Sequence, residues 1–135
     1  MSRVVFVVVS FLALSASVAT FADEPFTHTK DTLDTVKENV KAGKAVIVDV
    51  REQTEWDEAH LKAAIHVPKS KLDVPTEVEA LLKKVPKDKV IYTHCRAGRR
   101  ALACGEILKK HGYDVRPLKP GTQELLEAGL EKAEK

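Results

Sequence analysis

A single cysteine, Cys95, is followed at once by a short tract that holds three arginines and one glycine. The tract reads CRAGRR and covers residues 95–100, so the thiol lies close in sequence to three permanently charged guanidinium groups. A nearby cation stabilises the thiolate, which is the nucleophilic form of cysteine. Arginine also binds oxyanions through its paired N–H donors. The pattern predicts a cysteine nucleophile that acts on an anionic substrate.

Apolar periodicity places this tract between a strand and a helix. Residues 89–94 form a short β-rich apolar run, and apolar side chains recur at helical spacing in residues 100–111. A turn at Gly98 can point backbone N–H groups inward as an anion-binding nest, to which the start of the helix adds its positive end. The candidate site residues are the catalytic Cys95 and the substrate-binding Arg96, Ala97, Gly98, Arg99 and Arg100.

A second interpretation treats Cys95 as a buried structural cysteine beside a solvated basic turn. The coincidence of a strand, a glycine-bearing turn, three arginines and a helix start favours chemistry over that alternative. Cys104 is the opposite case, because it shares a helical apolar stripe with Ala101 and Ile107, which predicts an inert core thiol. Spacing leaves a disulfide between the two cysteines open, although this helical position and the strict geometry of disulfides argue against it.

Strands and helices alternate along the rest of the chain. Helical spacing or polar patterning predicts helices around residues 33–40, 75–85 and 123–135, with a short helix or turn at 52–60. Short apolar runs predict strands at 45–50, 63–68, 89–94 and 113–118, and we expect an edge strand at 25–29. This order predicts a single α/β domain with a mainly parallel central sheet and helices on both faces.

The first 22 residues have the layout of a secretory signal peptide. Arg3 precedes an apolar run, and small residues then suit cleavage after Ala22 or after Ala19. An uncleaved membrane anchor over residues 4–22 is the alternative, which the serines in this run disfavour. We therefore expect an exported protein, periplasmic or secreted, without stable membrane association after cleavage. Its domain would cover residues 23–135, with a core at about 29–130.

Composition restricts the partners. The 135-residue chain has a net charge of +2 at pH 7, and its charges are dispersed, whereas a nucleic-acid-binding protein needs a concentrated basic face. His28, His66 and His111 show no ligand spacing with one another or with the cysteines, so we expect neither a metal nor another cofactor. The expected partners are small molecules, an anionic donor and its acceptor.

Two motifs in the correct order and spacing resemble those of a known family. CRAGRR has the Cys-x-x-Gly-x-Arg form of the active-site loop of rhodaneses, the thiosulfate sulfurtransferases. Residues 49–68 (DVREQTEWDEAHLKAAIHVP) resemble the upstream motif of that family, and residues 112–130 resemble its C-terminal segment. The similarity covers about residues 29–130 and is of the exported, single-domain type. It implies a rhodanese-like fold.

The resemblance also implies a covalent mechanism in two steps. Cys95 would take the outer sulfur of thiosulfate or a similar anionic donor as a persulfide, and a thiol or cyanide would then remove it. Backbone amides of residues 96–100 would stabilise the sulfur anion, and the three arginines would attract the donor. The alternatives are a sulfur carrier or partner-binding module with poor turnover and a phosphatase-like hydrolase. The related dual-specificity phosphatases use a loop one residue longer, which disfavours the hydrolase.

Four positions depart from the family pattern. Ala59 replaces a glycine, Pro120-Gly121 replaces a Gly-Gly pair, Leu125 replaces a tryptophan, and Ala101 replaces a serine or threonine. The last three could alter the pocket wall and the choice of acceptor. The reaction type is therefore better defined by the sequence than the substrate.

Residues near the predicted loop have supporting roles in this interpretation. Asp49 and Arg51 end a neighbouring strand on the same rim as Cys95, and their family counterparts mainly brace the loop. Glu55, Trp56 and His60 are expected to serve packing and hydrogen bonding. His94 precedes Cys95 directly, but adjacent strand residues point to opposite faces, so it is not expected to be the base of the thiol.

Overall fold

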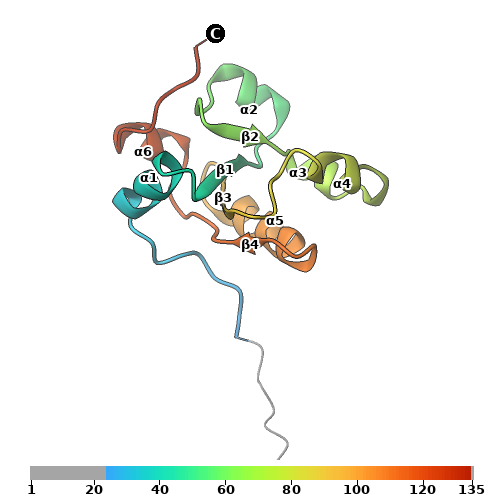
Figure 1. Cartoon of the computed structure of the whole chain (residues 1–135). Helices are drawn as coiled ribbons and strands as arrows, with labels where there is room; N and C mark the ends of the chain where they lie inside the picture. Colours follow the sequence, from blue (N-terminus) through green and yellow to red (C-terminus); the bar gives the residue numbers. More distant parts are fainter. Residues whose placement is uncertain (1–23, 135) are drawn as a thin grey trace, which may run out of the picture.

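The structure is a computed structural model that describes residues 24–134, so the signal-peptide prediction lies outside the described residues. One four-stranded sheet has the order β2-β1-β3-β4 (Figure 1). Its strands are β1 (Ala45–Asp49), β2 (Ala64–His66), β3 (Val90–His94) and β4 (Asp114–Val115). Every strand pair in the sheet is parallel, which confirms the predicted architecture.

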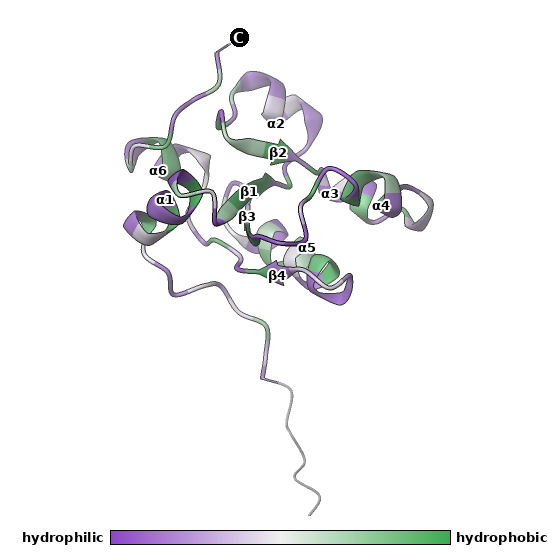
Figure 2. Ribbon diagram, viewed as in Figure 1, coloured by the Kyte–Doolittle hydropathy of each residue, from purple (hydrophilic) through white to green (hydrophobic). Residues whose placement is uncertain are grey.

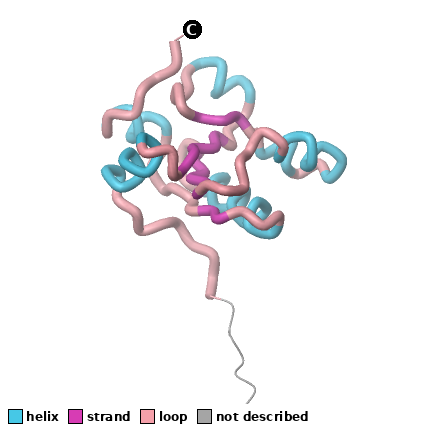
Figure 3. The backbone as a smooth tube through the Cα atoms, viewed as in Figure 1, coloured by secondary structure: helices cyan, strands magenta, loops and turns pink. Residues whose placement is uncertain are grey.

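Helices cover both faces of this sheet, as the alternation of elements predicts (Figure 3). The helices α1 (Leu33–Lys41) and α6 (Thr122–Glu127) lie on one face. The other face carries α3 (Lys69–Leu72), α4 (Pro75–Leu82) and α5 (Arg99–Lys110). A short helix, α2 (Gln53–Glu58), connects β1 to β2 and lies beyond β2 in Figure 1.

The alternating side chains of β1 supply two separate cores. Ala45 and Ile47 pack with α1 and α6, whereas Val48 packs with the helices of the opposite face. Figure 2 shows the apolar colour concentrated on the strands and on the helix surfaces turned toward them. Because both faces of the sheet are buried, its strands are nearly continuous apolar runs rather than alternating ones.

Some elements differ from their predicted extents. Residues 25–29 form no strand: Thr29 donates a single backbone bond of 2.8 Å to Pro117, so the expected edge strand is wrong. The last strand is regular over β4, and beyond it Arg116 and Leu118 still donate backbone bonds of 2.8 Å to Ile91 and Thr93 of β3. The closing helix ends at Glu127, and Gly129 follows with a φ of 99°.

Helix α3 was not predicted, since its four residues are too short to show a period. It begins directly after Pro68, whose fixed φ suits a helix start. Within residues 24–134, no helix has the length and apolarity needed to cross a bilayer.

Candidate active site

The predicted loop lies where β3 ends and α5 begins. Gly98, with a φ of 93°, caps α5 at its N-terminus in the left-handed conformation that glycine adopts readily. This turn aims the Gly98 N–H at Cys95 Sγ over 3.1 Å, and the Ala101 N–H donates to the same sulfur over 3.4 Å. Two amides therefore stabilise negative charge on the sulfur, and one of them, Ala101, lies outside the predicted set of residues 96–100.

The sulfur is less exposed than an open nucleophile. Cys95 has 1% of its surface accessible, so the alternative of a buried cysteine is correct as far as burial goes. The residue nevertheless lines a cavity of about 460 Å³, together with Lys69, Arg96, Ala97, Arg99, Arg100 and Ala103. A small anion in that cavity would meet the thiol at its wall, so low exposure does not seal the sulfur from a substrate.

The three loop arginines differ in their partners. Arg100 forms a bidentate ion pair with Glu55, at 2.7 and 2.9 Å, and this hydrogen bonding lowers the pKa of the Glu55 carboxyl. Arg96 and Arg99 are exposed and form no ion pair with any residue from 24 to 134. The cations with free charge at the cavity are therefore Arg96 and Arg99, whereas Arg100 mainly ties α5 to α2.

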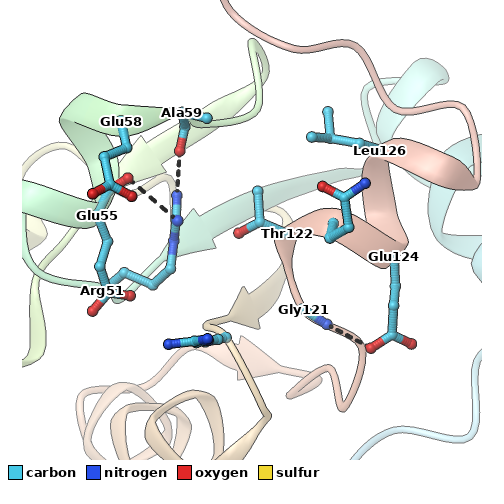
Figure 4. Close-up of a pocket in the computed structure, with 10 residues that line it drawn as sticks. Arg51, Glu55, Glu58, Ala59, Gly121, Thr122, Glu124 and Leu126 are labelled. Carbon is cyan, nitrogen blue, oxygen red and sulfur yellow. Dashed lines mark hydrogen bonds between the residues drawn. The ribbon is translucent and has the colours of Figure 1, made fainter.

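Asp49 and Arg51, expected to brace the loop, bond to each other and to the segment around α2. Arg51 donates to both Asp49 carboxylate oxygens and to the carbonyls of Glu55 and Ala59. Burial alone would raise the pKa of Asp49, but the hydrogen bonds from Arg51 outweigh it and hold the pKa below its usual range. Figure 4 shows the Arg51 side chain directed at the carbonyl of Glu55 in α2 and at the carbonyl of Ala59 just after this helix. Neither residue lines the cavity at Cys95.

His94 lies on the other side of the sheet from the thiol. Its ring is fully buried, 3.6 Å from Asp49, and neither ring nitrogen has a hydrogen-bond partner. Burial lowers the pKa of His94 to about 4, so the ring is neutral at physiological pH. Cys95 packs in the opposite cluster, which agrees with the prediction that His94 is not its base.

Cys104 has the inert surroundings expected of a core thiol. It is completely buried in α5, and desolvation raises its pKa to about 12. Both cysteines are free, so the disulfide that spacing left open does not form. The expected packing roles upstream also hold, since the rings of Trp56 and His60 stack with centroids 3.6 Å apart.

A second cavity adjoins the loop. It measures about 390 Å³ and lies between α2 and α6, with residues such as Arg51, Glu58, Arg96 and Thr122 on its walls (Figure 4). The turn before α6 touches the loop here, because a Cβ on Gly121 would lie only 2.1 Å from the Arg96 carbonyl oxygen. Leu125, the position expected to be tryptophan from the family pattern, is fully buried in the core between the sheet, α1 and α6. It does not line this cavity.

Sequence reasoning missed two residues that touch the site. Lys69, on the unpredicted α3, lines the Cys95 cavity, although its ammonium group pairs with Asp73. His28 reaches the loop from the chain start and lies 2.8 Å from the Gly98 carbonyl. Neither has a local sequence signal, because both approach the loop through tertiary packing. No cluster of three metal-ligating side chains occurs in the described part of the chain.

The fold and this loop define a class of protein. The family model of the rhodanese-like domain matches residues 32–128, and the chain therefore belongs to the rhodanese family. A rhodanese-related protein from Thermoplasma volcanium has a solved structure that agrees with a TM-score of 0.60 at 26% identity, over 75% of this chain and 93% of that one.

Two relatives are similar in sequence at low identity. A thiosulfate:glutathione sulfurtransferase from Saccharomyces cerevisiae is 34% identical over 57% of this chain and 60% of its own length. YrkF of Bacillus subtilis, named as a candidate sulfur carrier, is 30% identical over 60% of this chain and 41% of its own length. The chain thus spans less than two thirds of the relatives it matches.

Proposed function

We propose that this protein is a sulfurtransferase that carries sulfur as a persulfide on Cys95. The observation that carries the proposal is the pair of amide N–H groups on Cys95 Sγ, at 3.1 and 3.4 Å, in the wall of a cavity with two unpaired arginines. Backbone amides preorganised at the Cys95 sulfur stabilise the thiolate that attacks the donor, and the same positive loop favours the persulfide anion, whose charge lies on the outer sulfur.

Thiosulfate is the proposed donor, since a small dianion suits a cavity bordered by Arg96 and Arg99. The Cys95 thiolate attacks the outer sulfur, the S–S bond of thiosulfate breaks, and sulfite leaves with the bonding electron pair. The new persulfide carries one negative charge on its outer sulfur, one S–S bond away from the Sγ atom that the Gly98 and Ala101 amides contact. An acceptor thiolate or cyanide then attacks the outer sulfur and regenerates the Cys95 thiolate.

Intact-mass measurement tests the first step directly. After incubation with thiosulfate, the protein should gain the mass of one sulfur, and a reducing thiol should remove it. Cys95→Ala should gain nothing, whereas Cys104→Ala should gain the same mass as the native chain. Absence of the adduct in the native protein would overturn the proposal.

A carrier that delivers sulfur to a partner protein is a second candidate, favoured by the low exposure of Cys95 and by the similarity to YrkF. The two functions differ in turnover. A sulfurtransferase should produce thiocyanate from thiosulfate and cyanide at a saturable, steady rate with ping-pong kinetics. A carrier should load one sulfur and release it to small acceptors only slowly.

We also propose export of the mature chain, which rests on the layout of residues 1–22. N-terminal sequencing of protein recovered from the periplasm or culture medium tests it. A first residue of Asp23, or of Thr20 for the alternative cleavage, would support export. Recovery of the chain with Met1 in the cytoplasmic fraction would contradict it.

A further inference from the structure

Residues 24–31 precede the matched family domain and pack against it as an extended strap (Figure 1, blue). The strap is anchored at both ends. Near its start, Phe26 packs against Gly105 of α5, and Lys109 lies over the Phe26 ring at 5.4 Å. At its end, Asp31 accepts hydrogen bonds from the Tyr92 hydroxyl and from Arg116.

Between these anchors, His28 reaches the predicted catalytic loop. Its Nε2 lies 2.8 Å from the Gly98 carbonyl oxygen, a contact between residues 70 apart in sequence. A carbonyl only accepts hydrogen bonds, so Nε2 must carry the hydrogen. The same oxygen also accepts the Leu102 N–H over 3.1 Å, so both of its lone pairs have donors.

Gly98 is the more conformationally free of the two residues whose amides contact Cys95. Glycine has the widest conformational freedom of any residue, yet its N–H makes the shorter bond to the sulfur, at 3.1 Å. A small rotation of this residue would turn the N–H away. The His28 ring and the Lys119 backbone both lie close to Gly98, at 2.9 and 3.1 Å from a Cβ built on that residue.

We propose that His28 is a positioning residue for sulfur transfer, which fixes the Gly98 carbonyl and thereby keeps the Gly98 N–H on the sulfur of Cys95. The strap supplies this contact from outside the family domain, and His28 does not line the Cys95 cavity. The inference rests on the proposed function for its kinetic consequence, but its structural part concerns the free thiol alone.

Two variants of His28 in the full mature chain test the role. His28→Ala removes the donor, and His28→Gln replaces it with an amide of similar reach. We expect His28→Ala to lower the kcat for thiocyanate formation about tenfold, the effect of losing one hydrogen bond that positions a charged group. His28→Gln should recover most of this loss. His111→Ala, at the exposed end of α5, is the matched control and should match the native rate.

Two measurements do not depend on turnover. The pH midpoint of Cys95 alkylation by iodoacetamide should be higher in His28→Ala than in the native protein, and in His28→Gln it should be close to the native value. The Gly98 amide should exchange its hydrogen faster in His28→Ala, as observed by ¹⁵N NMR. Thermal unfolding of each variant shows whether it is folded. If His28→Ala does not fold, the native protein is compared with His28→Gln instead, and the exchange rate of the Gly98 amide is expected to be the same in both.

The outcomes separate cleanly. The inference would be overturned if folded His28→Ala had the same alkylation midpoint and the same Gly98 exchange rate as the native protein. It would also be overturned if His28→Gln or His111→Ala lost as much kcat as His28→Ala. A native protein without turnover would instead contradict the proposed function, and the alkylation and exchange measurements would still decide the role of His28.

Discussion

The two cysteines occupy the same apolar cluster and are almost equally buried, yet their surroundings differ in the property that matters for chemistry. Cys95 directly follows β3 and accepts hydrogen bonds from two backbone N–H groups, whereas Cys104 lies mid-helix, where desolvation raises its pKa to about 12. Burial therefore does not distinguish the thiol that we propose to be reactive from the inert one. Unpaired amide donors aimed at the sulfur do, because they replace the solvation that burial removes.

The most direct test of this difference is to measure the alkylation rates of both thiols in one sample. Native protein at pH 7.5 should be alkylated at Cys95 at least about 1,000 times faster than at Cys104, since the buried thiol is almost entirely protonated. Peptide mapping after timed exposure to iodoacetamide gives both rates. Comparable rates at the two positions would show that the amide donors do not govern reactivity.

The amide donors can be disturbed through the turn that aims them. Gly98→Ala should reduce sulfur transfer about 100-fold, the usual cost of losing one preorganised donor. A methyl group there meets His28 at 2.9 Å and Lys119 at 3.1 Å, in addition to the strain of the φ of 93°. Steady-state kinetics measures the loss.

Gly43→Ala is the control for that experiment, because Gly43 also has a positive φ, 71°, but nothing lies within 4 Å of the added methyl group. We expect it to lose about 1 kcal/mol of stability and to keep its rate. A similar loss of rate in both variants would assign the effect to general backbone strain.

His94 extends the comparison, since it is a buried titratable group without donors, like Cys104. Its folded pKa of about 4 is below the ordinary 6.5, so between these values the unfolded chain binds a proton that the folded chain excludes. Stability should therefore fall as the pH drops through this window, by about 2 kcal/mol at pH 5. Urea unfolding at pH 7 and pH 5 measures the difference.

His94→Gln should abolish most of this pH dependence, whatever its effect at pH 7. A native-like slope in that variant would place the titration elsewhere. The depressed pKa of Glu55 acts at lower pH, because the contribution of its pair with Arg100 is lost as pH falls through the folded pKa.

The smallest expected effects are changes in the KM for thiosulfate, which should differ among variants of the three loop arginines. Arg96→Ala and Arg99→Ala should each raise the KM for thiosulfate about fivefold, as expected for an exposed charge near an anion. The double variant Glu55→Gln, Arg100→Gln should leave that KM nearly unchanged, because the pair it removes is already internally neutral. Kinetics at varied thiosulfate measures all three, and a larger rise in the double variant would assign substrate contact to Arg100.

The sequence was most informative where local patterns decide structure. The loop at Cys95 was correctly placed between a strand and a helix, because apolar runs and helical spacing are local signals. The parallel sheet followed from the alternation of elements. The inert nature of Cys104 followed from its position on the apolar stripe of one helix.

Such local patterns do not predict which residues far apart in the sequence come into contact. Glu55 and Arg100 meet across 45 residues, and this pairing changes which arginines are free at the cavity. His28 meets Gly98 across 70 residues, from a segment expected to be an edge strand. The low exposure of Cys95 also depends on how α3 and α5 pack around it. These features arise from distances in the folded chain rather than from spacing along it.

The turn at Pro120-Gly121 has a consequence for which substitutions this domain can accept. With the Arg96 carbonyl oxygen 2.1 Å from any Cβ at position 121, no side chain fits there unless the backbone of the loop shifts. Pro120 shows that its own position accepts a bulky ring. Variation in natural sequences should thus be asymmetric, free at the first residue of the pair and almost forbidden at the second.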